Sequence, residues 1–239
     1  MTDSKLTTLT EKKVPAFLVV GISGYVTMLL NQNFINSYRK VTNGGKSTAA
    51  EKLKNLFPNA NIMSQDAYFM DPEDERLRLL PQLNGHENWE SLDAIEMDRL
   101  LQDVDKWMTD AMSSKQVGTV PLLIIEGFLI FNHCVLANLF HRKYFIQIDR
   151  STCINRRRFR TYNPPDEPGY FEEVVWPMYL KNKAELSAQH DIVYLDGTKS
   201  PDDIVSQIAE DIRWFTDSGC PLVDPISVPC LLSGLDVSH

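Results

Sequence analysis

The chain has 239 residues, of which 43% are hydrophobic, and a formal net charge of −8. This length fits one large α/β domain or two small ones, and the apolar content is sufficient for a buried core. The negative balance argues against a general nucleic-acid-binding protein, and every apolar run is too short to cross a bilayer.

The cysteines indicate the compartment. Cys134, Cys153, Cys220 and Cys230 lack a metal-binding spacing and are typical of a reducing environment rather than of a disulfide scaffold. Residues 1–13 are polar and contain no secretory apolar segment. We therefore expect a cytoplasmic or nuclear protein without a membrane or nucleic-acid partner, and we expect a monomer.

Taken in chain order, the hydrophobic pattern predicts alternating strands and helices. Apolar runs predict buried strands at 16–20, 61–64, 121–125, 144–148 and 192–195. Periodicity and capping residues predict helices at 46–56, at 91–112, after Asp149, at 171–189 and after Ser200. We expect polar loops at 71–85 and 161–169, and a kink or a restart at Pro177.

This alternation predicts a parallel β-sheet flanked by helices on both faces, a three-layer α/β sandwich. We assign residues 16–216 to this domain, residues 1–15 to a flexible tail and residues 217–239 to an irregular C-terminal tail. Segment 25–40 is rich in Asn and in apolar residues, and its composition predicts no particular structure.

A phosphate-binding motif interrupted by this segment is the main functional signal. Residues 43–48 read Asn-Gly-Gly-Lys-Ser-Thr, the second half of the motif G-x-x-x-x-G-K-[ST]. The opening glycine is Gly24, at the end of the first strand, and removal of residues 25–40 restores the whole motif. The predicted nucleotide-binding loop comprises Gly24, Val41, Thr42, Asn43, Gly44, Gly45, Lys46, Ser47 and Thr48. Lys46 would contact the β- and γ-phosphates, and the Ser47 hydroxyl would bind Mg²⁺.

Two carboxylates follow buried strands. Asp66 comes directly after the second strand, where it could accept a proton from a hydroxyl that attacks the γ-phosphate, or could be a surface acid. Glu126 ends the third strand, where it could hold magnesium or be a buried structural group. Because the carboxyl ends of parallel strands share one edge, we expect both near the phosphate loop.

The arginine run Arg156-Arg157-Arg158, with Arg160, is dense for an acidic protein. Guanidinium groups neutralise the charge that develops in phosphoryl transfer, although such a run also occurs on solvated helix faces. Trp89 and Tyr162, each considered alone, are more typical of packing than of a ligand platform.

With these residues laid out, the chain resembles the nicotinamide riboside kinase family, related to the uridine kinases. The resemblance runs from about Phe17 to Phe215, apart from the insertion. Its most specific blocks are Ile62-Met63-Ser64-Gln65-Asp66, residues 123–128 (Leu-Ile-Ile-Glu-Gly-Phe), residues 162–166 (Tyr-Asn-Pro-Pro-Asp), residues 168–171 (Pro-Gly-Tyr-Phe), residues 175–180 (Val-Trp-Pro-Met-Tyr-Leu) and residues 193–200 (Val-Tyr-Leu-Asp-Gly-Thr-Lys-Ser).

The resemblance implies a phosphate-loop kinase fold and transfer of phosphate from ATP to the ribosyl 5′-hydroxyl of nicotinamide riboside, or of nicotinic acid riboside, for NAD synthesis. It implies that Asp66 accepts the proton and that Ser47, Asp66 and Glu126 hold Mg²⁺. The substrate residues that it implies are Asp66, Ala67, Tyr68, Phe69, Trp89, Glu90, Arg158, Tyr162 and Asn163. Trp89 and Tyr162 would stack on the pyridine ring, whose positive charge suits an aromatic face. Arg157, Arg160, Lys199 and Ser200 would contact ATP.

This chain departs from the family in three places. Glu90 stands where the family usually has Asp, and the stretch between Arg158 and Tyr162 is one residue shorter, which affects the assignment of Arg160. The third departure is the insertion. One interpretation is that residues 25–40 are encoded by an unremoved intron in a predicted gene and are absent from the working protein. The other is that they are genuine and weaken catalysis, in a relative that still binds the riboside. Uridine or cytidine kinase activity is a third interpretation.

Overall fold

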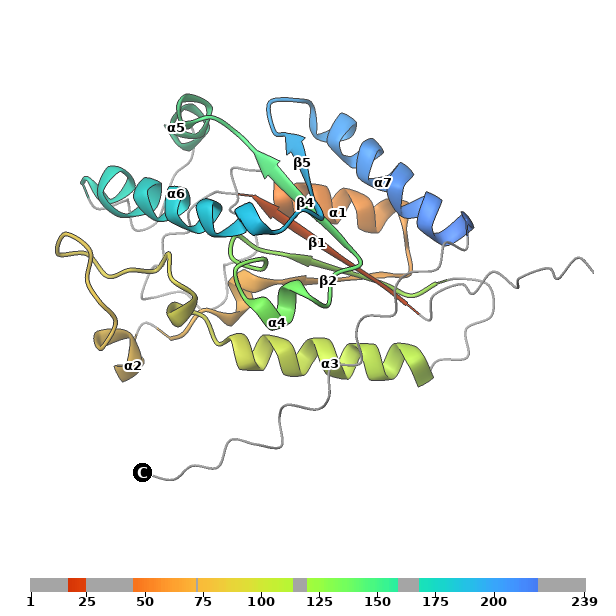
Figure 1. Cartoon of the computed structure of the whole chain (residues 1–239), viewed down its shortest axis with the longest axis horizontal. Helices are drawn as coiled ribbons and strands as arrows, with labels where there is room; N and C mark the ends of the chain where they lie inside the picture. The colour runs from red at the N-terminus through yellow and green to blue at the C-terminus, as the bar shows by residue number, and fades with distance from the viewer. Residues whose placement is uncertain (1–16, 25–44, 72, 114–119, 159–167, 219–239) are drawn as a thin grey trace, which may run out of the picture.

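The computed structural model describes residues 17–24, 45–71, 73–113, 120–158 and 168–218. Within them, five parallel strands form one sheet in the order β2-β3-β1-β4-β5 (Figure 1). The strands are β1 (Leu18–Gly24), β2 (Ala60–Ser64), β3 (Leu122–Glu126), β4 (Arg142–Gln147) and β5 (Ile192–Asp196). This arrangement confirms the predicted parallel sheet.

Helices cover both faces of the sheet, as Figure 1 shows. The longer helices are α1 (Lys46–Leu56), α3 (Met97–Ser113), α5 (Arg150–Arg158), α6 (Trp176–Glu185) and α7 (Pro201–Ser218). The shorter ones are η1 (Gln65–Tyr68), α2 (Glu75–Arg78), η2 (Leu92–Ala94), α4 (Cys134–Ala137), the π-helical turn η3 (Phe171–Val175) and η4 (Leu186–Ala188). Of the described helices, none has both the length and the apolar character needed to cross a membrane.

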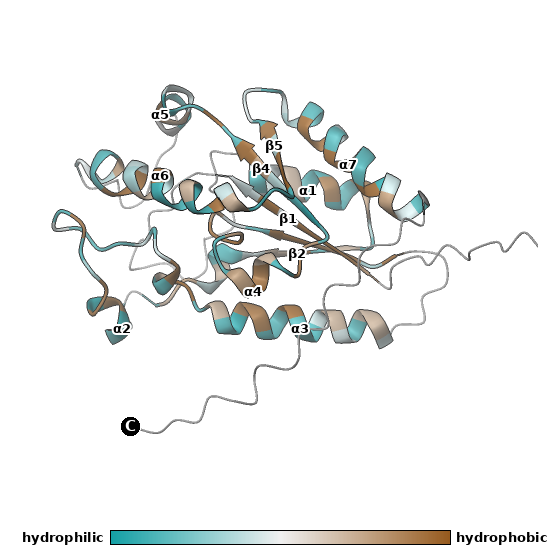
Figure 2. Ribbon diagram, in the orientation of Figure 1, coloured by the Kyte–Doolittle hydropathy of each residue, from teal (hydrophilic) through white to brown (hydrophobic). Residues whose placement is uncertain are grey.

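Two hydrophobic clusters hold the layers together. Leu53 of α1 and Ile208 of α7 pack with Val20 of β1 on one face, and Leu100 of α3 and Met178 of α6 pack with Val19 on the other. Strands β1 and β3 are buried along their whole length, because helices cover both of their sides. Figure 2 shows the same pattern as apolar strands between helices with polar outer faces.

The helix predicted over 91–112 is interrupted, so that prediction was wrong in its first part. Ser91 caps η2, Ile95 is extended (φ −121°, ψ 133°), and α3 begins at Met97. The break lets Ile95 form an antiparallel bridge with Phe69, while the Glu96 N–H donates to the Tyr68 carbonyl at 2.7 Å. Hydrophobic periodicity could not predict this break, because it depends on the bridge and the hydrogen bond that the backbone of Ile95 and Glu96 forms with the segment after β2.

The polar loop predicted over 71–85 was also incomplete, because it contains α2. The Asp74 carboxylate accepts a hydrogen bond from the Arg76 N–H at 2.9 Å, which is an N-cap interaction. At Pro177, where we predicted a kink or a restart, the helix changes type without a break, because the π-helical turn η3 runs directly into α6. Helix α6 begins at Trp176, and Pro177 lies in its first turn, where its missing N–H removes no helical hydrogen bond.

Candidate active site

The candidate site lies where β1, β2 and β3 end. Glu126 is in register with Ile22 of β1 and with Ser64 of β2, so the three carboxyl ends lie side by side. The chain goes from β1 to one edge of the sheet through α1, and from β3 to the other edge through β4. A sheet of this topology forms its ligand crevice at that reversal of strand order.

Helix α1 brings its N-terminus to this edge. Gly45 precedes the helix with a φ of 84°, a left-handed conformation that favours glycine. Lys46 is the first helical residue, only 1% exposed, and the described first turn carries no acidic side chain. The N–H groups of a first helical turn and the positive end of the helix dipole make this N-terminus suitable for an anion such as a phosphate.

Asp66 and Glu126 lie near this lysine. Burial and, after it, the negative charge of Glu126 raise the pKa of the half-buried Asp66, the positive charge of Lys46 opposes both effects, and the resulting pKa is about 7. The three groups therefore interact electrostatically, as expected from the sequence. A carboxylate whose pKa lies near neutral pH is suited to general base catalysis.

Glu126 has the features of a cation ligand. Its side chain is 3% exposed, the Ser64 hydroxyl donates to Oε1 at 2.5 Å, and Oε2 is buried without a hydrogen-bond partner. A buried carboxylate oxygen without a partner is costly, and a divalent cation with oxygen ligands would satisfy it. The residues at this edge, including Ser47 at the start of α1, therefore fit Mg²⁺.

Gln65 and Gly127, the chain neighbours of Asp66 and Glu126, pack against each other, and sequence reasoning gave neither a role. The Gln65 side chain is fully buried, and its Oε1 accepts a hydrogen bond from the Leu129 N–H at 3.0 Å. A Cβ atom on Gly127 would lie 2.5 Å from the Cβ of Gln65, so only glycine allows this approach. The glycine directly after a strand-ending acid was the available signal.

The segment after Asp66 forms an aromatic wall. Phe69 stacks on Phe128, with ring centroids 6.0 Å apart, and meets Trp89 edge-on at 6.3 Å. Trp89 is 9% exposed and packs with Leu77 in a small cluster. Glu90 is 1% exposed, and its backbone carbonyl accepts from Asn182 Nδ2 at 3.2 Å. The predicted substrate residues from Asp66 to Phe69 and at 89–90 are therefore joined by the contact between Phe69 and Trp89.

The predicted ATP residues at the other side of the sheet follow β5. Lys199 is exposed, and Ser200 caps α7 by accepting from the Asp203 N–H at 3.1 Å. Arg156 Nη2 donates to the Gly197 carbonyl at 2.7 Å, which joins α5 to this segment. A cavity of about 390 Å³ lies at the ends of β4 and β5 and is lined by Asp149, Tyr194 and Thr198 among others.

The structure describes the other predicted site residues only in part. Gly24 ends β1 with a φ of 147°, and Arg157 and Arg158 lie in the last turn of α5. The remaining ones lie outside the described residues: Val41, Thr42, Asn43, Gly44, Arg160, Tyr162 and Asn163.

Comparison with known proteins gives the family. No family model matches the chain. Nicotinamide riboside kinase 1 of Mus musculus is 42% identical over 189 residues, which cover 76% of this chain and 95% of that protein. Nicotinamide riboside kinase 2 of Homo sapiens is 32% identical over 206 residues, which cover 82% of this chain and 81% of that protein. The chain belongs to the nicotinamide riboside kinase family.

This membership confirms the resemblance predicted from the sequence blocks. A uridine kinase of Chlamydia pneumoniae is 23% identical over 153 residues, which cover 57% of this chain and 66% of that protein. The similarity to nicotinamide riboside kinases is higher and extends over more of the chain, so the uridine kinase interpretation is not favoured.

Proposed function

We propose that this protein is an ATP-dependent kinase that phosphorylates the 5′-hydroxyl of nicotinamide riboside, and also of nicotinic acid riboside, to give the mononucleotide used in NAD synthesis. The observation that carries the proposal is the convergence of Asp66, Glu126 and Lys46, which interact electrostatically where three neighbouring strands end and α1 begins. In a member of this family, that arrangement has the groups needed for phosphoryl transfer.

Asp66 accepts the proton of the riboside 5′-hydroxyl as the 5′-oxygen of the riboside forms a bond to the γ-phosphorus. The bond between this phosphorus and the β,γ-bridging oxygen breaks, and ADP leaves with the electron pair. Lys46 and the N–H groups at the start of α1 stabilise the negative charge on the phosphate oxygens. A raised pKa supports Asp66 as the base, because its carboxylate is basic enough to take a proton near neutral pH.

Ser47, Asp66 and Glu126 would hold Mg²⁺, which neutralises triphosphate charge when it is bound. The unsatisfied Glu126 Oε2 supports this assignment. Around the substrate, we assign Trp89 and Tyr162 to the pyridine ring, Glu90 to the ribose hydroxyls, and Arg158 and Asn163 to the riboside. Arg157, Arg160, Lys199 and Ser200 are assigned to ATP.

We infer that the enzyme acts as a monomer in the cytoplasm or the nucleus. The four cysteines of the sequence lack a metal-binding spacing and are typical of a reducing compartment rather than of a disulfide scaffold.

A direct comparison of substrates tests the proposed function. We expect kcat/KM for nicotinamide riboside to exceed that for uridine at least about 100-fold, because a site built for one substrate's polar groups discriminates by at least that factor. The measurement is ADP release with nicotinamide riboside, nicotinic acid riboside, uridine and cytidine under one set of conditions. Equal or faster turnover of uridine contradicts the proposal. Riboside binding without turnover identifies a catalytically impaired relative instead.

Glu126→Gln tests the magnesium assignment. We expect the Mg²⁺ concentration for half-maximal activity to rise at least about tenfold, as losses of 10- to 100-fold are typical for disturbed metal sites. The Ser64 hydroxyl keeps an acceptor, so the fold should persist. Glu51→Gln, on the exposed side of α1, is the matched control. Binding of Mn²⁺ with ATP, followed by electron paramagnetic resonance, gives a readout that does not need turnover. An unchanged metal requirement would contradict the assignment.

A further inference from the structure

The end of η2 and the residues that lead into α3 hold the segment that carries Asp66. The Glu96 N–H donates to the Tyr68 carbonyl at 2.7 Å, and the Met70 N–H donates to the Ala94 carbonyl at 2.9 Å. These backbone bonds anchor the C-terminal part of the segment. The carbonyl of Ala67, which directly follows Asp66, is held by a side chain.

That side chain is Arg99, in the first turn of α3. Its Nη2 donates to the Ala67 carbonyl at 2.6 Å, and its guanidinium lies 4.8 Å from the centroid of the Tyr68 ring. The Tyr68 hydroxyl in turn donates to Asp103 Oδ2 at 2.8 Å, farther along α3. Helix α3 therefore contacts both residues that follow Asp66.

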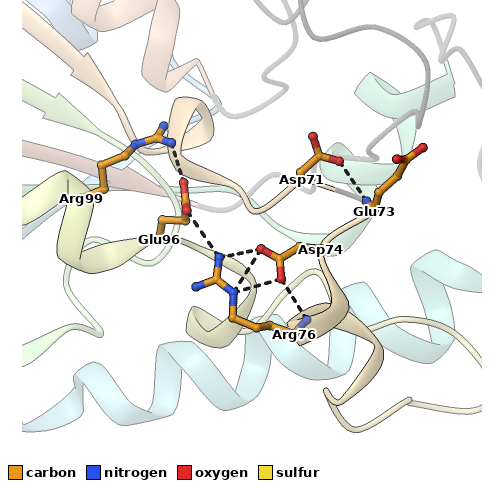
Figure 3. A network of polar contacts seen from close by, with 6 residues as sticks. All are labelled: Asp71, Glu73, Asp74, Arg76, Glu96 and Arg99. Atoms are coloured by element: carbon orange, nitrogen blue, oxygen red, sulfur yellow. Dashed lines mark hydrogen bonds and ion pairs between the residues drawn. The ribbon is translucent and has the colours of Figure 1, made fainter. Parts of the chain in front are cut away.

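A chain of ion pairs fixes Arg99 in this orientation, as Figure 3 shows. Glu96 pairs with Arg99 through Oε2 and with Arg76 Nη2 through Oε1, the latter at 3.5 Å. Arg76 also bonds both oxygens of Asp74, with Nη2 at 2.6 Å from Oδ2. Glu96 thus links the Asp66 segment to the cap of α2, on the substrate side of the sheet.

These pairs contribute little to global stability. The side chains of Arg99 and Arg76 are 51% and 60% exposed, and exposed ion pairs contribute about 0–1 kcal/mol. Their place in the molecule gives them another role. They constrain the peptide next to a general base, where a misplacement of about 1 Å costs about 100-fold in rate.

We propose that Arg99 is a positioning residue, which orients the Asp66 carboxylate through the Ala67 carbonyl and is itself oriented by Glu96. The link to rate rests on the proposed kinase function, whereas the link to the order of residues 65–70 does not. Within the described part of the chain, the polar partners of Arg99 are Glu96 and the Ala67 carbonyl rather than Asp66 itself. Its role is to restrict the backbone from which the base projects.

The test compares Arg99→Ala and Arg99→Lys with Lys52→Ala. Lys52 forms an exposed ion pair with Asp202 at 2.6 Å on another part of the surface, which makes it a matched control. We expect Arg99→Ala to lower kcat at least about tenfold while KM for ATP changes less than twofold, and Arg99→Lys to retain part of the rate. Added methylguanidinium should restore activity to Arg99→Ala and leave Lys52→Ala unchanged.

Amide hydrogen exchange of the peptide spanning residues 65–70 gives a readout independent of activity. We expect faster exchange there in Arg99→Ala and unchanged exchange in the rest of the chain. If the wild type does not phosphorylate the riboside, the kinase proposal fails, and the exchange data alone decide the positioning role. Unchanged exchange at 65–70, or a uniform rise across the chain, would overturn the proposal.

Discussion

Asp66→Asn is expected to lower kcat by about 10²- to 10⁴-fold, the usual contribution of a positioned general base. An amide does not accept the riboside proton, but it has nearly the same shape as the carboxylate, so binding of both substrates should persist. Steady-state kinetics together with calorimetric titration of ATP and riboside check both parts. Asp105→Asn, on the exposed side of α3, is the control and should retain full activity.

The same substitution should stabilise the protein at high pH. The pKa of Asp66 is raised to about 7 from an ordinary value of 3.8, so between these values the folded protein holds a proton that the unfolded chain releases. The free energy of unfolding of the wild type therefore falls as pH rises through this range. In Asp66→Asn the free energy of unfolding does not fall in this way. The melting temperature of the variant minus that of the wild type should therefore be higher at pH 8 than at pH 4.

Protonation of Asp66 should affect the wild-type rate in the opposite sense to its effect on stability: the rate should rise as pH rises. The base must be unprotonated, so kcat/KM for the riboside should fall on the acid side of about pH 7. A melting-temperature difference independent of pH, or a rate limb near pH 4, would contradict the raised pKa. Loss of rate without the pH-dependent change in stability would indicate that Asp66 is a ligand rather than a base with a raised pKa.

The sequence predicted the positions of Asp66, Glu126 and Lys46 better than the contacts around them, for a physical reason. Parallel strands end at one edge, so residues that follow two apolar runs can be placed together without coordinates. This places Asp66 and Glu126 near each other, and the motif places Lys46 beside them. The apolar runs also locate the strands, because strands covered on both faces are continuously hydrophobic.

The supporting contacts could not be predicted in this way. Arg99 and Ala67 are far apart in the sequence, and an arginine in a polar helix turn is ordinary on a solvated face. The break at Ile95 depends on its bridge to Phe69, a tertiary contact that overrides helical periodicity. Gln65 lies inside one of the family blocks, yet only the structure reveals that it is buried against Gly127, next to the base.

The insertion gives the second large expected effect. Deletion of residues 25–40 should raise kcat/KM for ATP at least about 100-fold over the full chain, because a restored loop aims consecutive N–H groups at one phosphate. The structure describes the first glycine of the motif, Gly24, and its last, Gly45. A Cβ on Gly24 would lie 2.5 Å from the Ile146 carbonyl oxygen, which fixes the end of β1 against β4, and Gly45 leads directly into α1.

Loop length alone does not explain such an effect, since the added closure entropy is only about 1–2 kcal/mol. Replacement of residues 25–40 by a Gly/Ser segment of equal length separates the effect of length from that of composition. If the interrupted phosphate loop is the cause, this variant should have a kcat/KM for ATP as low as that of the full chain. Lys46→Met in the deleted chain should abolish the gain. Calorimetry should show weaker ATP binding but equal riboside binding in the full chain.

Two measurements decide which chain is the working enzyme. A tryptic peptide from the native source that joins Gly24 directly to Val41 shows that residues 25–40 are absent from it. An intact mass that includes the segment, together with turnover equal to that of the deleted chain, contradicts the expectation. In that case the phosphate cradle tolerates a long excursion between its first glycine and its lysine, and ATP must be held mainly by the α1 N-terminus and Lys46, which the described structure already places beside Asp66.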